Sequence, residues 1–322
     1  MITGCRGGRC SARHEFILNN GRIAMRPYKK MPSLDNWILA ARPRTLVAAV
    51  VPVIVGAAFA KQAALEHWPF ALCAALSALC IQIGTNLAND YSDFKRGADT
   101  SQRIGPVRVT QAGLIAPQRV RNGAVLAFAL AAAFGIPLIA RGGWPILLIG
   151  ILSILCGWAY TGGPFPLGYN GLGELFVLLF FGFAAVAGTH YVLTLDWNPL
   201  VLFIALAPGL HASALLAVNN VRDIETDRAA GKRTLTARFG RTFGRAEFAL
   251  LILLPFFVPV VLFFNFHFSF LILLPVLSLP SAMPPLRTAL TREDGPSLIS
   301  ALAGTARLQL LFGVLFAAGL AL

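Results

Sequence analysis

Charged residues are scarce in this chain of 322 residues: Asp and Glu together number 14, and all charged residues make up 13% of the sequence. An average soluble domain contains about 25% charged residues. Hydrophobic residues reach 57%, and the mean hydropathy is +0.69. This composition excludes a disordered protein and argues strongly against a soluble globular enzyme. It is typical of a protein that crosses a membrane several times.

Cysteine is also scarce, with five residues in the whole chain. Cys5, Cys10 and His14 have a loosely metal-like spacing, but structural zinc is almost always four-coordinate and a fourth ligand is not evident. We therefore expect no zinc site there. The basic segment 1–33 carries no apolar run of signal-peptide length. We expect it to be a disordered N-terminal extension, followed by one transmembrane domain over residues 34–322.

Nine apolar segments follow the basic extension. A membrane-spanning helix needs roughly 20 apolar residues, with a range of about 17–25. The segments are 46–60, 69–90, 120–140, 144–161, 173–193, 199–221, 247–264, 267–285 and 303–322. Several are short or contain proline, so eight spans are the alternative. We predict an all-α fold, a polytopic bundle of about nine transmembrane helices.

The basic residues fall almost entirely on one side of this bundle. If the N-terminus lies in the cytoplasm, all but Lys61 and Arg141 of the 27 Lys and Arg residues lie in cytoplasmic segments. This is the asymmetry of the positive-inside rule. It explains the net charge of +13 without nucleic acid, so we expect no nucleic-acid partner. It also predicts a C-terminus on the outside and a site facing the cytoplasm.

Polar residues close the second expected span. Asn86, Asp90 and Asp93 lie at positions i, i+4 and i+7, which is one face of a helix. Carboxylates within or beside a membrane are costly, so they are functional-site candidates by default.

The sixth expected span ends in the same way. Asn219, Asp223 and Asp227 lie at i, i+4 and i+8, again on one face. A pattern of Asn, Asp and a further Asp therefore occurs twice, at the same predicted membrane face. This repetition favours one shared site built from both segments.

Clustered Asp and Asn oxygens are the ligands that Mg²⁺ prefers, and Mg²⁺ commonly bridges to substrate phosphates. We therefore predict that Asp90, Asp93, Asp223 and Asp227 bind Mg²⁺ and act in catalysis, with Asn86 and Asn219 contacting substrate. Neighbouring basic side chains are expected to neutralise phosphate oxygens. These are Lys95, Arg103, Arg108, Arg222, Lys232 and Arg233. A diphosphate bound in this way is an activated leaving group.

We call the two sets, Asn86, Asp90 and Asp93 in the first and Asn219, Asp223 and Asp227 in the second, the first and second stripes. Other interpretations of these stripes are open at this point. A single Asp at a helix end is usually solvated or structural, and Asp and Asn inside helices also serve ion-coupled transporters. The basic flanks favour the phosphate site over an ion pathway. Tyr91 and Tyr160 are candidates to contact the substrate and to stabilise a positive charge, although aromatic residues more often simply pack. The Gly- and Pro-rich loop 161–171 favours a cap over the site.

The motifs resemble those of the UbiA superfamily of intramembrane aromatic prenyltransferases. The resemblance covers roughly residues 35–322 and is strongest for the branch that acts on 1,4-dihydroxy-2-naphthoate. It rests on Ala41–Leu46, Asn86–Asp93, Arg103–Gln111, Tyr160–Glu174 and Asn219–Leu235. The first motif departs from the common pattern, because Asp93 follows Asp90 by three residues where many members have an aspartate four residues on.

The resemblance implies nine helices around a central cavity in the inner, cytoplasmic membrane, with Mg²⁺ and the diphosphate of a polyprenyl donor held by the two Asp motifs. It also implies a reaction. A polyprenyl chain is transferred from polyprenyl diphosphate to dihydroxynaphthoate, with loss of CO₂ and diphosphate, giving demethylmenaquinone. Acceptors such as 4-hydroxybenzoate, homogentisate or haem are the alternatives within the superfamily.

Overall fold

The computed structural model describes residues 17–19, 22–24, 32–98 and 105–322. The chain divides into two compact units, Met1–Met31 and Pro32–Leu322. In the first unit, strands β1 (Ile17–Asn19) and β2 (Arg22–Ala24) pair antiparallel. The rest of that unit lies outside the described residues, including the Cys5, Cys10 and His14 group. The expected disorder of segment 1–33 therefore stays a prediction.

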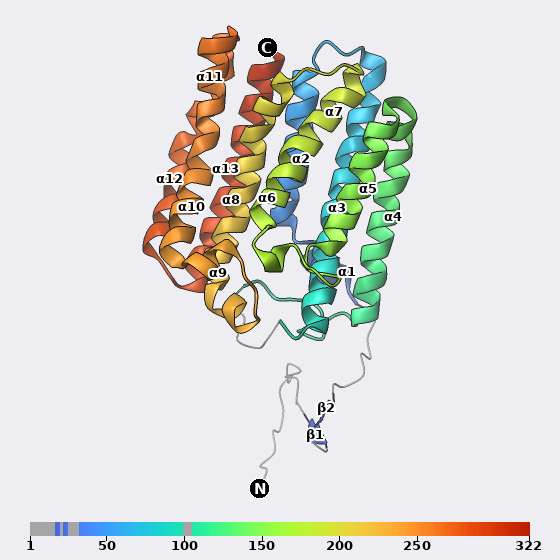
Figure 1. Cartoon of the computed structure of the whole chain (residues 1–322), viewed down its shortest axis with the longest axis vertical. Helices are drawn as coiled ribbons and strands as arrows, with labels where there is room; N and C mark the ends of the chain where they lie inside the picture. Colours follow the sequence, from blue (N-terminus) through green and yellow to red (C-terminus); the bar gives the residue numbers. More distant parts are fainter. Residues whose placement is uncertain (1–16, 20–21, 25–31, 99–104) are drawn as a thin grey trace, which may run out of the picture. The chain divides into compact units, whose positions relative to one another are not determined.

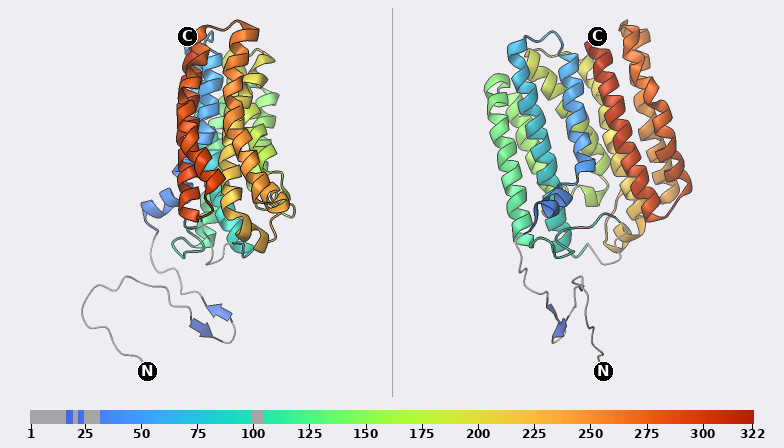
Figure 2. Two further views of the ribbon diagram at one scale, coloured as in Figure 1. Left: turned by 90° about the vertical axis from the view of Figure 1, so that its left-hand side faces the viewer. Right: turned by 180° about the vertical axis from the view of Figure 1, so that it is seen from behind.

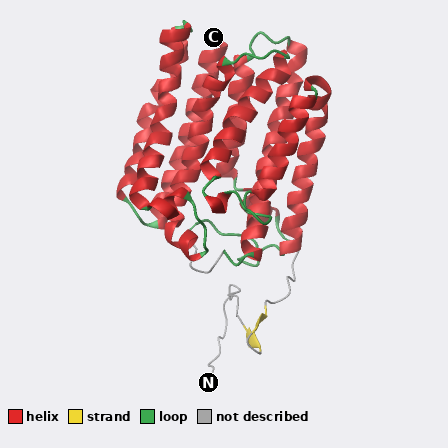
Figure 3. Ribbon diagram, in the orientation of Figure 1, coloured by secondary structure: helices red, strands yellow, loops and turns green. Residues whose placement is uncertain are grey.

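The second unit is helical, with long helices running side by side and loops gathered at their two ends (Figure 1, Figure 3). The elements are α1 (Leu34–Ala41), α2 (Pro43–Phe59), η1 (Leu65–His67), α3 (Trp68–Lys95), α4 (Pro117–Gly142), α5 (Trp144–Ala159), η2 (Gly168–Asn170), α6 (Gly173–Val177), η3 (Leu178–Ala184), α7 (Ala185–Thr194), α8 (Leu200–Ala229), α9 (Leu235–Phe239), α10 (Arg241–Leu253), η4 (Leu254–Phe256), α11 (Phe257–Phe266), η5 (Phe270–Ser278), α12 (Leu279–Thr291) and α13 (Gly295–Ala321).

Each of the nine predicted apolar segments coincides with helix in the described part of the chain. Seven helical stretches are long and apolar enough to cross a membrane, and α1 with α2 forms an eighth that is bent by 55°. The remaining segment of the nine is α5, which has 16 residues, one short of the usual minimum of about 17. The all-α, multi-span prediction is confirmed, with nine as an approximate number of spans.

Several spans change helix type along their length. The stretch α6–η3–α7 is continuous but widens into a π-helix at Leu178–Ala184. Proline removes a backbone donor and disturbs the α-helical ladder, and Pro255 lies where α10 tightens into η4. The boundary expected between the spans 247–264 and 267–285 is present, because His267 adopts a left-handed conformation that ends α11.

Two groups of helices pack around separate apolar cores. In one, buried side chains of α2, α8, α10, η4, α11, η5, α12 and α13 form a large apolar cluster. In the other, α1, α3 and α4 pack together with the loop before α4. The C-terminal ends of α3 and α8 lie at the same end of the unit as α1 and α9, away from the C-terminus of the chain (Figure 1, Figure 2).

Candidate active site

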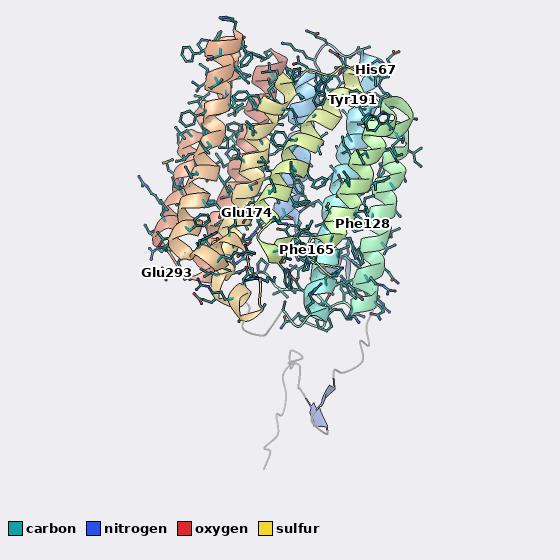
Figure 4. All side chains as sticks on the ribbon, viewed as in Figure 1. His67, Phe128, Phe165, Glu174, Tyr191 and Glu293 are labelled. Atoms are coloured by element: carbon teal, nitrogen blue, oxygen red, sulfur yellow. The ribbon has the colours of Figure 1, made fainter. Side chains whose placement is uncertain are left out.

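A cavity of about 750 Å³ lies among α2, α3, α4, α5, α7 and α8. Its lining is polar where α3 and α8 end and apolar further along α4, α5 and α7. In Figure 4, Glu174 and Phe165 lie toward the end where α3 and α8 finish, and His67 and Tyr191 lie at the opposite end. The volume is that of a small-molecule site, roughly 300–1,000 Å³. A ligand with a charged head and a long apolar tail fits this division.

Helices α3 and α8 end in the same backbone motif. The carbonyl oxygens of Asp93 and Asp227 each accept the N–H five residues later, at 3.0 Å and 2.8 Å respectively. Gly97 and Gly231 adopt left-handed conformations with φ of 69° and 72°, which suit glycine because it has no Cβ. These are Schellman caps. They place Asp93 and Asp227 at equivalent positions on their helices.

Asp93 is the most deeply buried carboxylate of the cavity, with 1% of its surface exposed. Its Oδ2 accepts a hydrogen bond from Arg108 Nη2 at 3.1 Å and lies 3.6 Å from Lys232 Nζ. The Tyr169 hydroxyl donates to Oδ1 at 2.8 Å. A buried carboxylate requires such partners, because an uncompensated charge is costly to bury.

Lys232 connects the two helix ends. Its Nζ lies 3.6 Å from Asp93 Oδ2 and 3.6 Å from Asp227 Oδ1. The same ammonium lies 4.8 Å from the centroid of the Tyr169 ring, within range of a cation–π contact. The two predicted stripes, far apart in the sequence, therefore meet through one cation.

The predicted residues of the second stripe all line the cavity. Arg222 forms a bidentate pair with Asp223, with Nε to Oδ1 at 2.7 Å and Nη2 to Oδ2 at 2.6 Å. Asn219 donates to the Leu215 carbonyl at 3.0 Å through its Nδ2. This bond uses one of the two N–H groups of the amide and leaves the side-chain oxygen of Asn219 available to a ligand.

Asp90 departs from the prediction, because it does not line the cavity. It is 2% exposed, and its two carboxylate oxygens accept the backbone N–H groups of Val109 and Thr110, each at 3.1 Å. Its carboxylate thus holds the loop that carries Arg108. This contact gives Asp90 a structural role beside the cavity, and its predicted role as a metal ligand stays a prediction.

Other members of the first stripe and its flank are also placed differently than expected. Tyr91 packs half-buried in the apolar cluster of α3 and α4, and Lys95 is exposed. Neither lines the cavity. Asn86 does line it, but its Nδ2 donates to Thr45 Oγ1 at 3.0 Å. Arg103 lies outside the described residues.

Two residues of the site were missed by the sequence analysis. Asn89 lines the cavity, and its Oδ1 accepts the Thr161 hydroxyl at 2.8 Å. It precedes Asp93 by four residues, the same spacing as Asn219 and Asp223. The signal was present in the sequence, but the pair Asn86 and Asp90 has this spacing too. Tyr169 lies in the loop expected to cap the site, where composition gave no reason to single it out.

Tyr160, a predicted candidate to contact the substrate, lines the cavity. Its phenol is a hydrogen-bond donor at neutral pH, as tyrosine ordinarily is. The loop that follows is anchored beside the end of α8, since Arg233 N–H donates to the Tyr169 carbonyl at 2.7 Å.

The donor set suits Mg²⁺. Asp93, Asp223, Asp227, Asn89 and Asn219 all line one cavity and present hard oxygen ligands. Over the described ranges, no three His, Cys, Asp or Glu side chains are close enough to hold an ion by themselves. Mg²⁺ commonly binds through one or two carboxylates together with substrate phosphates. The residues therefore fit a metal that arrives with a diphosphate better than a dedicated metal cage.

Fold and site together define a multi-pass membrane protein whose cavity is polar at one end and apolar along the rest. Residues 49–303 match the model of the UbiA prenyltransferase family. This chain belongs to that family, which confirms the resemblance seen in the motifs.

Named relatives are similar over nearly their whole length. Identity is 35% over 294 residues to the 1,4-dihydroxy-2-naphthoate octaprenyltransferase of Mycobacterium leprae, covering 91% of this chain and 98% of that protein. It is 36% over 292 residues to the enzyme of the same name from Escherichia coli, covering 88% and 94%.

Solved structures share the fold at low identity. A UbiA homolog from Aeropyrum pernix has a TM-score of 0.65 at 14% identity, covering 85% of this chain and 96% of that one. A UbiA homolog from Archaeoglobus fulgidus, bound to GPP and Mg²⁺, has a TM-score of 0.61 at 16% identity, covering 89% and 100%.

Proposed function

We propose that this chain is an Mg²⁺-dependent prenyltransferase that acts on 1,4-dihydroxy-2-naphthoate. It transfers a polyprenyl chain from polyprenyl diphosphate, releases CO₂ and diphosphate, and gives the quinol form of demethylmenaquinone, because the acceptor is a hydroquinone and the transfer involves no oxidant. The observation that carries this proposal is the contact of Lys232 with aspartates of both helix ends, in a cavity that continues as an apolar channel. The names of the relatives that cover most of the chain support the choice of acceptor.

The polar end of the cavity receives the diphosphate. Arg108, Arg222 and Lys232 provide cations that bind phosphate oxygens, each now paired with an aspartate. Asp93, Asp223 and Asp227 would hold Mg²⁺, with Asn89 and Asn219 as further oxygen donors. When bound, the metal supplies electrostatic stabilisation of the leaving diphosphate.

The remaining walls protect the allylic cation that forms as the diphosphate leaves. The Tyr160 and Tyr169 rings line the cavity close to the carboxylates, and aromatic faces stabilise positive charge. Apolar side chains such as Ile139, Ile149 and Phe180 enclose the isoprenoid and keep water from the cation. The acceptor ring approaches between the polar end and the apolar walls of the cavity and captures the cation.

The membrane placement is part of the proposal. The distribution of Lys and Arg supports an inner-membrane protein with its N-terminus and polar cavity end in the cytoplasm and its C-terminus outside. A reporter fused after Leu322 is expected to score as external. A cytoplasmic score would overturn the odd number of spans.

The decisive experiment is a reconstituted reaction. Purified protein is incubated with dihydroxynaphthoate, a polyprenyl diphosphate and Mg²⁺, and the quinone and released diphosphate are followed by mass spectrometry and a phosphate assay. Formation of the quinol, detected as demethylmenaquinone after oxidation in air, that requires all three components supports the proposal. Ion flux coupled to a substrate, with no new carbon–carbon bond, would instead support a transporter.

A further inference from the structure

Some polar residues of the cavity have no part in the diphosphate site. They come from the corner between α1 and α2 and from the facing turn of α3, at the end of the unit that also holds α9 (Figure 2). These residues are Arg42, Arg44, Thr45, Gln82 and Asn86. We call this group the corner cluster.

The corner is held in a conformation that a non-glycine residue rarely adopts. Arg42 has φ of 53°, in the left-handed region, where α1 and α2 meet. Asn86 Nδ2 donates to the Ala41 carbonyl at 2.9 Å, and Gln82 Nε2 donates to Thr45 Oγ1 at 3.2 Å. Such strain persists only where the surroundings hold it, and it is concentrated at functional sites. The hydrogen bonds from α3 thus fix the backbone from which the Arg42 and Arg44 side chains extend.

The corner cluster is positively charged and carries no acid of its own. The carboxylates that line the cavity are Asp93, Asp223 and Asp227, and each is already paired with Arg or Lys elsewhere. Arg44 makes no side-chain hydrogen bond or ion pair with any residue in the described part of the chain. The N-terminus of α2, also at this corner, has no side-chain cap, and such a terminus favours anions.

We propose that Arg42 and Arg44 bind the carboxylate of the aromatic acceptor. This inference rests on the proposed function, in which the acceptor is a naphthoate. A guanidinium matches a carboxylate in a bidentate fork, whereas a metal-bound diphosphate needs aspartates, and within the described ranges those that line the cavity are at the ends of α3 and α8. Asn86 and Asp93 are seven residues apart on α3, about 10 Å along the helix, which leaves room for an aromatic ring system between the two anions.

The exposure of Arg44 indicates a route for the acceptor. Arg44 is exposed and also lines the cavity, so it lies where the cavity meets the outside. A water-soluble carboxylate can therefore meet this cation before it enters, while the apolar donor tail occupies the other end. The two substrates bind at separate cationic groups of one cavity.

The reaction itself then removes the group that anchors the acceptor. The donor C–O bond breaks and its electrons leave with diphosphate, while the ring forms a carbon–carbon bond to the prenyl carbon. The ring–carboxylate bond breaks, CO₂ departs, and its electron pair returns to the ring, so atoms and charge balance without another reactant. The product has no anion for Arg42 and Arg44 to bind, and it is released into the lipid.

The test separates acceptor binding from donor binding. In purified full-length protein, Arg44→Gln should raise the KM for dihydroxynaphthoate by roughly tenfold or more, the range of a charged hydrogen bond, and leave the KM for the donor unchanged. Inhibition by 1-hydroxy-2-naphthoate should weaken by the same factor, and inhibition by 1-naphthol, which lacks the carboxylate, should not change. Arg44→Lys should recover part of the loss, and Arg42→Gln should repeat the pattern. The exposed Arg287, outside the cavity, gives the matched control Arg287→Gln.

Several outcomes would overturn the inference. An equal rise in both KM values would mean that the corner holds the diphosphate. Equal weakening of both inhibitors would mean a general distortion of the cavity. A loss that appears only with anionic lipid would assign the corner to lipid headgroups. If wild-type protein makes no quinone, the proposed function fails; if wild type is active and Arg44→Gln matches it, the corner inference alone fails.

Discussion

The C-terminal ends of α3 and α8 share a backbone motif but differ in their side chains. When Asp93 is matched to Asp227 through the two Schellman caps, every neighbouring position has a counterpart. The pairs are Asn86 with Asn220, Asn89 with Asp223, and Asp90 with Ile224. Thus α3 carries an amide where α8 carries a second cavity carboxylate.

The pairing of Asp90 with Ile224 explains why Asp90 does not line the cavity. Ile224 is 1% exposed and Asp90 is 2% exposed, so the same helix position points into packed protein on both helices. On α8 an apolar side chain fills that position. On α3 a carboxylate fills it and is satisfied by two backbone N–H groups. Equal spacing in the sequence therefore hides two different roles, one chemical and one structural.

Removal of the metal is expected to have the largest effect. Chelation should abolish turnover, because the carboxylates of both helix ends would lose the ion that they hold with the diphosphate. The melting temperature of the substrate-free protein should not change, since Arg108, Arg222 and Lys232 already neutralise these carboxylates. Adding Mg²⁺ back should restore turnover, which is the control. Turnover that survives complete chelation would contradict a metal held by both helix ends.

Asp223→Asn tests the side chain that α3 lacks. The substitution keeps the shape but removes one negative charge, and the rate should fall on the order of 10²–10³-fold, as for loss of a key electrostatic contact. The folded protein should persist, because the amide can still accept a hydrogen bond from Arg222. Steady-state kinetics on matched amounts of folded protein measure this. Glu66→Gln, on the exposed side of η1, is the control that should behave as wild type.

Lys232→Ala tests the cation that joins the helix ends. We expect the KM for the polyprenyl diphosphate to rise roughly tenfold through loss of a charged contact. Lys95→Ala is the matched comparison, since Lys95 is exposed and outside the cavity. If the Lys95 variant shows the larger rise, the sequence prediction for Lys95 is right and the placement described here is wrong.

Asp90→Asn should have the smallest effect on chemistry and a clear effect on stability. An amide presents one acceptor oxygen to two backbone donors, so one N–H loses its partner, at a cost of about 1–3 kcal/mol. The melting temperature should fall, while the rate per folded molecule stays near that of wild type. A stable Asp90→Asn protein with a rate as low as that of Asp223→Asn would show that Asp90 takes part in the reaction.

Hydropathy and charge were sufficient to predict the fold class and the positions of the spans, because membrane-spanning helices satisfy their own backbone and need long apolar runs. The second motif was also predicted correctly as a stripe on one helix face. The first could not be resolved by spacing. At about 100° per residue, Asn89, Asp93 and Asp90 fall within an arc of about 100°, and only the packing of the loop at Val109 and Thr110 decides which of them reach the cavity.

The contacts of Arg108, Tyr169 and Lys232 with Asp93 were equally out of reach of the sequence pattern. Each comes from a different loop, and loops are positioned by tertiary contacts rather than by periodicity. The sequence suggested that basic residues would serve a phosphate. It contained no signal that they would first neutralise the aspartates beside them.

The most direct test of a site shared by both helix ends is metal binding measured without turnover. Mn²⁺, which prefers the same carboxylate oxygens as Mg²⁺, can be followed by electron paramagnetic resonance in the presence of a non-ionisable thiolo analogue of a prenyl diphosphate. The account predicts analogue-dependent Mn²⁺ binding that is lost in Asp93→Asn and in Asp227→Asn but kept in folded Asp90→Asn. Binding that survives in either of the first two variants, or disappears in the third, would contradict it.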